Sequence, residues 1–453
     1  MRKLIVVPVI FFAFVAAQAQ AVPTEKKYSP ELLKQDLSFL KEQLFTVHAD
    51  PFTELSKEKY EQVFSRMEQS IGDSMTVVEF FKLVKPAVAN LSDEHAEISL
   101  PKEFANFDGL AVFLPFTLRK AGAVYEVDTV LVPGTGLTKG IPVSKVNGMA
   151  VEHLLKLCAS YTTGYPDQRQ NNALRQFGYL YTLATPFREK AVVSTPAGSE
   201  ITMKNTNFQV WQQYLSVLNG RPGGCTQILS YQKFGETGYI NACSFLARSD
   251  SAFEAYGKTV DSLFNRAKQD KVKQLLIDVS TNSGGNSALG DFILRQFYGG
   301  DYQSYQMNWR RSDAYLNTLR GWKMRHNEYE KMKPGEVLHY GSSVSRIEKV
   351  ENPYKGKVYI VVGSGTFSSA IMFATIIKDN KLATLVGEEP QNGHPTHFGE
   401  MYGSKLPNTQ LALRFGVKEW IRPAGKQAGN KLTPDLKIDL SGGVERWIEQ
   451  LPR

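Results

Sequence analysis

Cysteine is scarce in this chain of 453 residues, which has three: Cys158, Cys225 and Cys243. No Cys-x-x-Cys pair and no Cys/His cluster of metal-ligand spacing occurs, which excludes a zinc finger and a thioredoxin-like redox motif. An odd count leaves at least one thiol unpaired. Cys225 and Cys243 could pair in an oxidising compartment, although no spacing demands it, and a buried apolar role is expected for free thiols.

An excess of one charge is also lacking. The chain holds 53 Lys and Arg against 45 Asp and Glu, a formal net charge of +8, and the cations form no basic stripe. No nucleic-acid partner is therefore expected. The Gly-x-Gly-x-x-Gly fingerprint of dinucleotide-binding folds is absent, and no metal or organic cofactor is indicated.

The apolar run at the N-terminus is short for a membrane span. Arg2 and Lys3 precede the run at Leu4–Ala17, and small residues follow it up to Ala21, which is typical of a secretory signal peptide over residues 1–21. We therefore expect an exported protein, periplasmic or extracellular, with no stable membrane span after the signal peptide is cleaved.

The rest of the composition is that of a globular protein, and the length favours two or three domains. Residues 22–105 are predicted to be the first domain, and to be helical. Ser29-Pro30 is typical of a helix start, and Thr76–Glu79 has the capping-box pattern that begins another helix. His48, in the loop after the first helix, is expected to be structural or at the surface.

The helical unit ends in the turn Leu91-Ser92-Asp93-Glu94-His95, which runs into an alternating strand. His95 stands at the join, where loops on a rigid scaffold commonly present catalytic groups. A lone histidine at such a place is more often a surface residue, so both interpretations stay open here.

Residues 106–205 are β-rich and are predicted to form a second domain. The segment 160–190 shows no assignable pattern, and residues 206–224, which end in Arg-Pro-Gly-Gly, are predicted to be a linker. The elements expected in the second domain are strands at 110–118 and 124–132, a strand closed by the turn Asn147-Gly148, a helix at 151–157 and a hairpin at 191–203.

Residues 225–453 alternate strands with helices, which indicates an α/β domain. The strand expected at Gln274–Val279 runs into the pair Gly284-Gly285 and then into a helix. Such a pair lets backbone N–H groups approach a ligand closely, although a plain strand-to-helix turn explains it equally well.

Ser368 follows the apolar strand pattern at Val358–Val362 and precedes an apolar helix. A hydroxyl there lies beside the free N–H groups of a helix N-terminus, which suit a developing oxyanion. The alternative is that Ser368 only caps the helix, because serine is a preferred N-cap residue.

Three stretches of the chain, in this order, resemble the C-terminal processing (tail-specific) peptidases and their tricorn-like relatives. The first, Leu276–Gly285, is similar to the family's Asp-Leu-Arg-x-Asn-x-Gly-Gly strand and turn. The other two are Gly365–Ala370, with Lys378–Asn380 and Val386–Glu388 after it, and Pro434-Asp435. The middle region, with Gly136–Gly140 before Val143–Gly148, resembles the family's PDZ-like domain.

The resemblance covers most of residues 29–440 and implies a multidomain α/β protein. Its parts would be an N-terminal helical unit, a PDZ-like β-rich domain and a crotonase/Clp-like α/β peptidase core. The implied activity is that of an exported serine peptidase, acting on a peptide or protein substrate without a cofactor. Ser368 matches the nucleophile, and the N–H of Ser369 with that of Gly284 or Gly285 matches the oxyanion hole.

The resemblance implies a base at one of three histidines. Tail-specific members use a lysine after Gly-Glu-Pro, and here that position is taken by His394. Tricorn-like members use a histidine in a turn that Leu91–His95 resembles, so His95 is the preferred base, with His394 second and His397 third. The acid that would orient the histidine is Glu400 or Glu419.

Two other functions remain open from the sequence. Without a working histidine, the chain would be a catalytically inactive relative that binds peptides on the same scaffold. The third possibility is hydrolysis of a non-peptide acyl substrate, since crotonase-like cores host several acyl chemistries.

Overall fold

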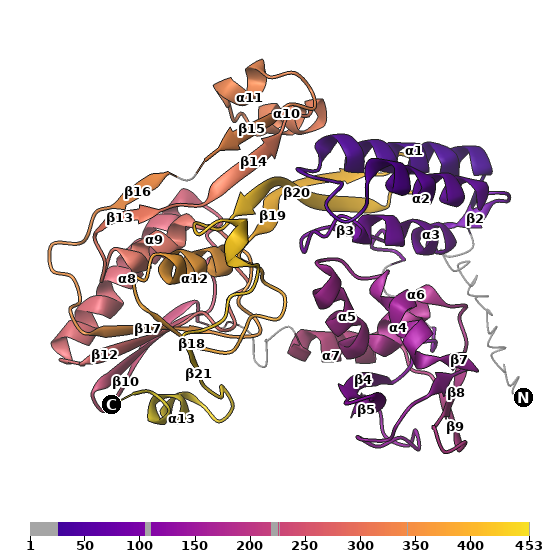
Figure 1. Ribbon diagram of the computed structural model, residues 1–453, viewed down its shortest axis with the longest axis horizontal. Helices are drawn as coiled ribbons and strands as arrows, with labels where there is room; N and C mark the ends of the chain where they lie inside the picture. The colour runs from indigo at the N-terminus through magenta and orange to yellow at the C-terminus, as the bar shows by residue number, and fades with distance from the viewer. Residues whose placement is uncertain (1–25, 105–109, 219–224, 226, 342, 453) are drawn as a thin grey trace, which may run out of the picture.

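The computed structural model describes residues 26–104, 110–218, 225, 227–341 and 343–452 (Figure 1). The expected signal peptide at residues 1–21 lies outside the described residues. In the part of the chain that is described, no helix is long and apolar enough to cross a membrane.

The N-terminal unit is helical. The expected capping box is confirmed: Thr76 Oγ1 accepts from the Glu79 N–H at 3.2 Å, and the Glu79 carboxylate accepts from the Thr76 N–H at 2.8 Å. The apolar faces of three helices meet in one buried cluster. The elements are β1 (Lys27–Tyr28), α1 (Pro30–Val47), α2 (Lys57–Gln69), β2 (Met75–Thr76), α3 (Val77–Ala89) and β3 (Glu97–Ser99).

The middle region is mixed α/β rather than β-rich, because the unassigned segment 160–190 folds largely into two helices. One sheet pairs β4 with β5, and a second has the order β7-β6-β8-β9. The elements are β4 (Phe116–Ala121), β5 (Val124–Val130), β6 (Lys145–Val146), β7 (Met149–Ala150), α4 (Val151–Ala159), α5 (Pro166–Arg175), α6 (Phe177–Ala184), β8 (Lys190–Ser194) and β9 (Glu200–Lys204).

Part of the expected linker at 206–224 is a helix, α7 (Phe208–Leu218). The Trp211 side chain is fully buried, and its indole N–H donates to the Leu114 carbonyl at 2.9 Å, which fastens α7 to the middle region. The linker prediction is wrong for this stretch. Burial of one indole among polar neighbours depends on its tertiary contacts, which the local pattern does not reveal.

A six-stranded sheet organises the C-terminal half, in the order β10-β11-β12-β17-β18-β21. The β10 strand is antiparallel to β11, and the other pairs are parallel. Three helices cover one face of this sheet and α13 covers the other (Figure 1). The elements are β10 (Leu229–Phe234), β11 (Thr237–Ala242), α8 (Asp250–Gln269), β12 (Gln274–Asp278), α9 (Ala288–Leu294), β17 (Lys357–Val362), α12 (Ser369–Asp379), β18 (Thr384–Gly387), β21 (Leu436–Lys437) and α13 (Val444–Glu449).

A second sheet joins the C-terminal half to the helical unit. Its order is β15-β14-β20-β19, and β20 also pairs with β3 in the register Arg414↔Glu97 (Figure 1). This places the strand that follows His95 against a hairpin from the C-terminal half. The remaining elements of the C-terminal half are β13 (Gly300–Gln303), β14 (Gln306–Arg310), α10 (Asp313–Gly321), α11 (Asn327–Lys331), β15 (Val337–Tyr340), β16 (Val344–Ile347), β19 (His397–Lys405), β20 (Ala412–Ile421) and the short 3-10 helix η2 (Lys426–Ala428).

The cysteine pairing left open by the sequence is made in the structure. Cys225 and Cys243 form a disulfide with their Cα atoms 5.9 Å apart. Cys158 is a free, buried thiol in α4, as expected for an apolar core residue.

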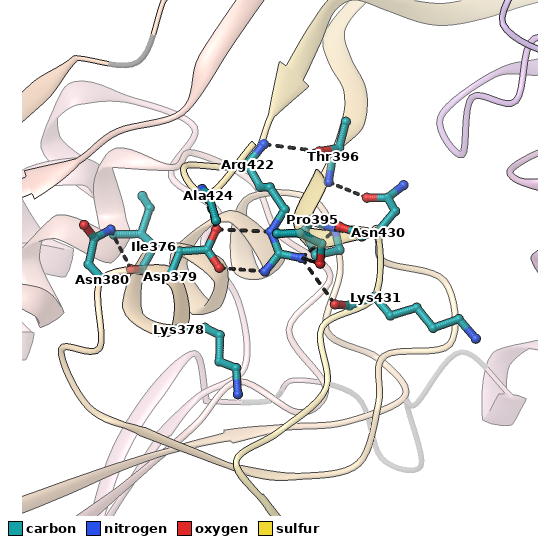
Figure 2. A network of polar contacts seen from close by, with 12 residues as sticks. Ile376, Lys378, Asp379, Asn380, Pro395, Thr396, Arg422, Ala424, Asn430 and Lys431 are labelled. Atoms are coloured by element: carbon teal, nitrogen blue, oxygen red, sulfur yellow. Dashed lines mark hydrogen bonds and ion pairs between the residues drawn. The ribbon is translucent and has the colours of Figure 1, made fainter. Parts of the chain in front are cut away.

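A buried ion pair ties the end of α12 to the end of β20 (Figure 2). The Arg422 guanidinium donates to both carboxylate oxygens of Asp379, at 2.6 and 3.1 Å, and the two side chains are 6% and 4% exposed. Arg422 also donates to the Gly429 carbonyl at 2.9 Å, and Asp379 accepts from the Ala424 N–H at 3.0 Å. The pair therefore holds the helix that begins next to Ser368 against the hairpin.

We expect Asp379→Ala to lower the free energy of unfolding by about 3–5 kcal/mol, because it leaves a guanidinium buried without its carboxylate. Urea titration followed by circular dichroism measures this. The control is Asp301→Ala, which removes an exposed pair with Arg346 and should cost at most about 1 kcal/mol. Equal losses in the two variants would show that the buried pair has no special role.

Candidate active site

Ser368 occupies a strained turn between β17 and α12. Its φ is 51° and its ψ is −126°, a conformation that a non-glycine residue rarely adopts and that persists only where the surroundings impose it. The residue stands at the N-cap position of α12, but its side chain makes no capping hydrogen bond. The capping role that the sequence left open is therefore not what this hydroxyl does.

Hydrogen bonds to the turn after β12 hold the serine turn. The Thr366 hydroxyl donates to the Val279 carbonyl at 2.8 Å and accepts from the Gly363 N–H at 3.0 Å. The Phe367 N–H donates to the Asn282 carbonyl at 3.0 Å. The turn after β12 and the turn after β17 are thus bonded to each other, which fixes the backbone on both sides of the serine.

The glycine pair predicted as a backbone cradle lies directly against Ser368. A Cβ added at Gly284 would be 2.7 Å from the Ser368 Cβ and 2.8 Å from the Ser369 N, so only glycine fits there. The Gly284 N–H already donates to Asn282 Oδ1 at 2.8 Å. The Ser369 hydroxyl donates to the Gly285 carbonyl at 2.6 Å, which fastens the glycine turn to the first residue of α12.

His95 lies beside the serine turn. Its ring stacks on that of Phe367, the residue before Ser368, with ring centroids 4.6 Å apart. Its Nδ1 is buried, has no hydrogen-bond partner among the described residues, and is 3.8 Å from Asp93 Oδ1. Burial lowers the pKa of His95 below its usual value, and Arg414 adds to this, while the Asp93 carboxylate acts in the opposite direction.

Asp93 and His48, which the sequence did not assign to the site, lie close to His95: Asp93 is next to its Nδ1, and His48 is next to Asp93. Asp93 is fully buried, and its Oδ1 accepts from the His95 N–H at 2.7 Å. His48 is fully buried as well, with its Nε2 3.4 Å from Asp93 Oδ2. Of the two expectations for His48, a structural or a surface residue, its burial excludes the surface position, and the side chain faces the carboxylate next to His95. Asp93 could have been suspected from its place two residues before the histidine, whereas His48 gave no local signal.

His394, the second candidate base, is engaged by carboxylates on both of its ring nitrogens. Its Nδ1 bonds Glu94, and its Nε2 is 4.0 Å from Asp167 Oδ1 in α5. The Glu94 side chain is 1% exposed, and burial raises its pKa to about 7 although the bond from His394 opposes this. Tyr165 packs against the His394 ring at 4.5 Å.

The loop around His394 contacts both the serine turn and the middle region. A Cβ at Gly393 would lie 2.5 Å from the Thr366 carbonyl oxygen, so the loop packs tightly on the turn. From the other side, the Tyr165 hydroxyl donates to the Thr396 carbonyl at 2.8 Å and the Gln168 amide to the Asn392 carbonyl at 3.1 Å.

His397, the third candidate, is buried with its Nδ1 3.0 Å from the His394 carbonyl oxygen. Burial lowers its pKa to about 4, with a further contribution from His95. Its ring centroid is 6.0 Å from that of His95. The histidine is therefore neutral and next to the candidate base, and its Nδ1 is held by a backbone carbonyl.

The two candidate acids face other partners. Glu400 accepts from the Tyr315 hydroxyl at 3.1 Å and lies 3.6 Å from Lys418 Nζ. Glu419 accepts from the Asn308 amide at 2.8 Å and pairs with Lys426. Among the described residues, no hydrogen bond or ion pair joins either carboxylate to His95. The described side chains also include no group of three or more His, Cys, Asp or Glu that could hold a metal ion.

The chain is similar to known proteins in family and in fold. Residues 236–438 match the model of peptidase family S41. No curated protein matches the chain significantly in sequence. Mature CPAF is similar in fold, with a TM-score of 0.58 and 15% identity over 90% of this chain and 92% of that one.

Two further solved structures are similar over most of their length. Mature CPAF complexed with lactacystin has a TM-score of 0.57 and 16% identity, over 90% of this chain and 94% of that one. The photosystem II D1 C-terminal processing protease has a TM-score of 0.41 and 14% identity, over 93% and 96%. At such identities the likeness to these structures concerns the fold alone. The family match includes both the glycine turn and the serine turn; the chain is a serine-type peptidase, and its residues 236–438 form a domain of peptidase family S41, the tail-specific peptidases.

Proposed function

We propose that this peptidase cleaves peptide bonds through an acyl-enzyme on Ser368, with His95 as the general base. The observation that supports it most is the stacking of the His95 ring on Phe367 at 4.6 Å. It brings a histidine from the helical unit onto the strained serine turn of the C-terminal half. A serine hydroxyl needs such a neighbour to remove its proton.

Burial suits His95 to this role. A pKa below the usual value keeps the imidazole neutral at pH 7, so that it can accept a proton. Its Nδ1 faces Asp93, which leaves Nε2, on the other edge of the ring, for the Ser368 hydroxyl. The serine oxygen attacks the substrate carbonyl while Nε2 takes its proton, and the imidazolium then protonates the leaving amine. The same nitrogen then takes a proton from water, whose oxygen attacks the ester, and returns it to the Ser368 oxygen as the ester C–O bond breaks and the acid product leaves.

The oxyanion would be held by the N–H groups of Ser369 and Gly285. Ser369 is the first residue of α12, where N–H groups have no partner within the helix and the helix dipole favours negative charge. Gly285 is a better second donor than Gly284, because the Gly284 N–H already donates to Asn282 Oδ1. The Ser369 hydroxyl, bonded to the Gly285 carbonyl, would keep the two donors in register.

The proposal extends to the other parts of the chain. Residues 106–205 would be a PDZ-like domain that gates the site, since α5 bonds the loop that packs on the serine turn. Residues 225–453 would be a crotonase-like core. Export is supported by the Cys225–Cys243 disulfide, because such bonds persist in oxidising compartments.

Ser368→Ala should lower peptide hydrolysis on the order of a million-fold, since it removes the nucleophile, and should leave the thermal unfolding midpoint near that of the wild type. A fluorophosphonate probe followed by peptide mapping should find its adduct on Ser368. The matched control is Ser364→Ala, on the same turn, which should keep the adduct and the activity. Unimpaired hydrolysis by Ser368→Ala would rule the proposal out.

The rate of adduct formation should depend on pH through His95. Because burial lowers the pKa of His95, its base form persists below the usual value of about 6.5. The rate should therefore stay level from pH 8 to about pH 6.5 and fall only at lower pH. His95→Gln should abolish labelling, and His394→Gln should retain it; the reverse result would make His394 the base.

Ser369→Ala tests the proposed oxyanion hole. It keeps the backbone N–H and removes the hydroxyl that holds the Gly285 carbonyl. We expect kcat to fall by about ten- to a thousand-fold while KM changes little, because the donors act mainly on the transition state. Unchanged kcat would mean that the hydroxyl does not position the glycine turn.

A further inference from the structure

We infer that His48 is a positioning residue for His95 and acts on it through the Asp93 carboxylate. The inference rests on the proposed roles of Ser368 and His95. It also replaces Glu400 and Glu419 by Asp93 as the acid that orients the base, because those two carboxylates are bonded to other side chains.

The His48 ring is fixed in one orientation and one tautomer. The side chain is fully buried at the C-terminal end of α1, and its Nδ1 accepts from the Asp50 N–H at 3.2 Å. Since an accepting nitrogen carries no proton, the proton of the neutral ring lies on Nε2. That nitrogen faces Asp93 Oδ2 at 3.4 Å.

The surroundings of His48 leave it little room to turn. The Arg310 Nε donates to the carbonyls of His48 and Ala49, at 3.2 and 3.1 Å, which ties this turn to β14. The ring packs between two aromatic side chains, 4.5 Å from Phe398 and 5.7 Å from Phe415. Because the His48 ring cannot turn, its Nε2 stays directed at the Asp93 carboxylate and can fix the position of that carboxylate.

Asp93 connects the two histidines with opposite oxygens. Its Oδ2 faces His48 and accepts from the Gly416 N–H at 2.7 Å, while its Oδ1 accepts from the His95 N–H and faces His95 Nδ1. Burial alone would raise the pKa of Asp93, but the groups that face the carboxylate, His48 first and then His95 and the Gly416 N–H, outweigh burial and lower the pKa. The carboxylate therefore stays ionised.

An ionised acid at this place determines the tautomer of His95. It favours the proton on Nδ1, which leaves the lone pair on Nε2 for the serine, and it stabilises the imidazolium that forms during catalysis. The other charged or titratable groups that face His95 are Arg414 in β20 and His397 in β19. Of the three, Asp93 is the one that also contacts His48.

Two variants of His48 separate this role from a general effect on folding. In His48→Gln the amide nitrogen reaches the place of Nε2 and keeps a donor to Asp93. In His48→Asn the amide reaches only the place of Nδ1. Both changes put a polar amide at the same buried site, so they differ mainly in the donor. Tyr60→Phe is the control for stability alone, because it removes a buried hydroxyl bonded to the Ala87 carbonyl in the same helical unit.

The closing experiment combines labelling with a readout that does not depend on activity. Fluorophosphonate adduct formation on Ser368 is measured against pH, and the His95 ring is followed by ¹⁵N NMR of protein labelled in histidine, assigned with His95→Gln. We expect His48→Asn to slow labelling about ten- to a hundred-fold, as loss of an orienting partner typically does. It should also lower the pKa of His95 and populate the Nε2–H tautomer, whereas His48→Gln and Tyr60→Phe should stay near wild type.

Each outcome decides between the two claims. Equal labelling rates and equal His95 spectra in His48→Gln and His48→Asn would overturn the role of His48. Failure of the wild type to label, with the His95 pKa still lowered by His48→Asn, would overturn the proposed catalysis and leave the coupling intact. If His48→Asn does not fold, Asp93→Asn must lower the His95 pKa in the same way, and an unchanged pKa there would also overturn the inference.

Discussion

The pairing of β20 with β3 is the interaction on which the rest of the site depends. The β3 strand begins two residues after His95, and β20 belongs to the hairpin that follows the serine turn in the chain. The Gly416 N–H, in the same strand, donates to the Asp93 carboxylate. Because strand pairing shifts only by whole residues, the turn Leu91–His95, which precedes β3, has little freedom to move relative to the hairpin. The turn that carries His95 and the serine turn therefore come together through backbone hydrogen bonds made outside the site itself.

The second constraint is strain at Ser368, which the surrounding backbone must impose. A non-glycine residue with this φ and ψ costs about 1–3 kcal/mol. Hydrogen bonds from Thr366 and Phe367 hold the turn, and Gly284 packs on the Ser368 Cβ where any side chain would collide. The two turns can therefore approach this closely only because residue 284 is a glycine and has no Cβ. The same close approach brings the N–H of Ser369 near the glycine turn, which is the place of the proposed oxyanion hole.

Burial gives chemically similar groups different roles around this site. Asp93 accepts hydrogen bonds from two backbone N–H groups and remains ionised, whereas burial raises the pKa of its neighbour Glu94 to about 7. Among the histidines, burial holds His397 neutral with a pKa of about 4, and the ring of His95 stacks on Phe367 in the serine turn. Groups of one chemical type with environments that push their pKa values apart are typical of sites that move protons. The bond between His394 and Glu94 joins this network to α5 of the middle region.

The features that the sequence by itself determined are local ones. The capping box at Thr76, the glycine pair after β12 and the serine between a strand and a helix depend on residues a few positions apart, so patterns of residue type reveal them. Only the tertiary structure decided which charged groups meet: His48 with Asp93, Glu94 with His394, and Glu400 and Glu419 with partners other than His95. It also decided that Trp211 is buried and that segment 160–190 is largely helical. These contacts mostly join residues far apart in the chain, and they depend on strand register and side-chain direction, which no local pattern specifies.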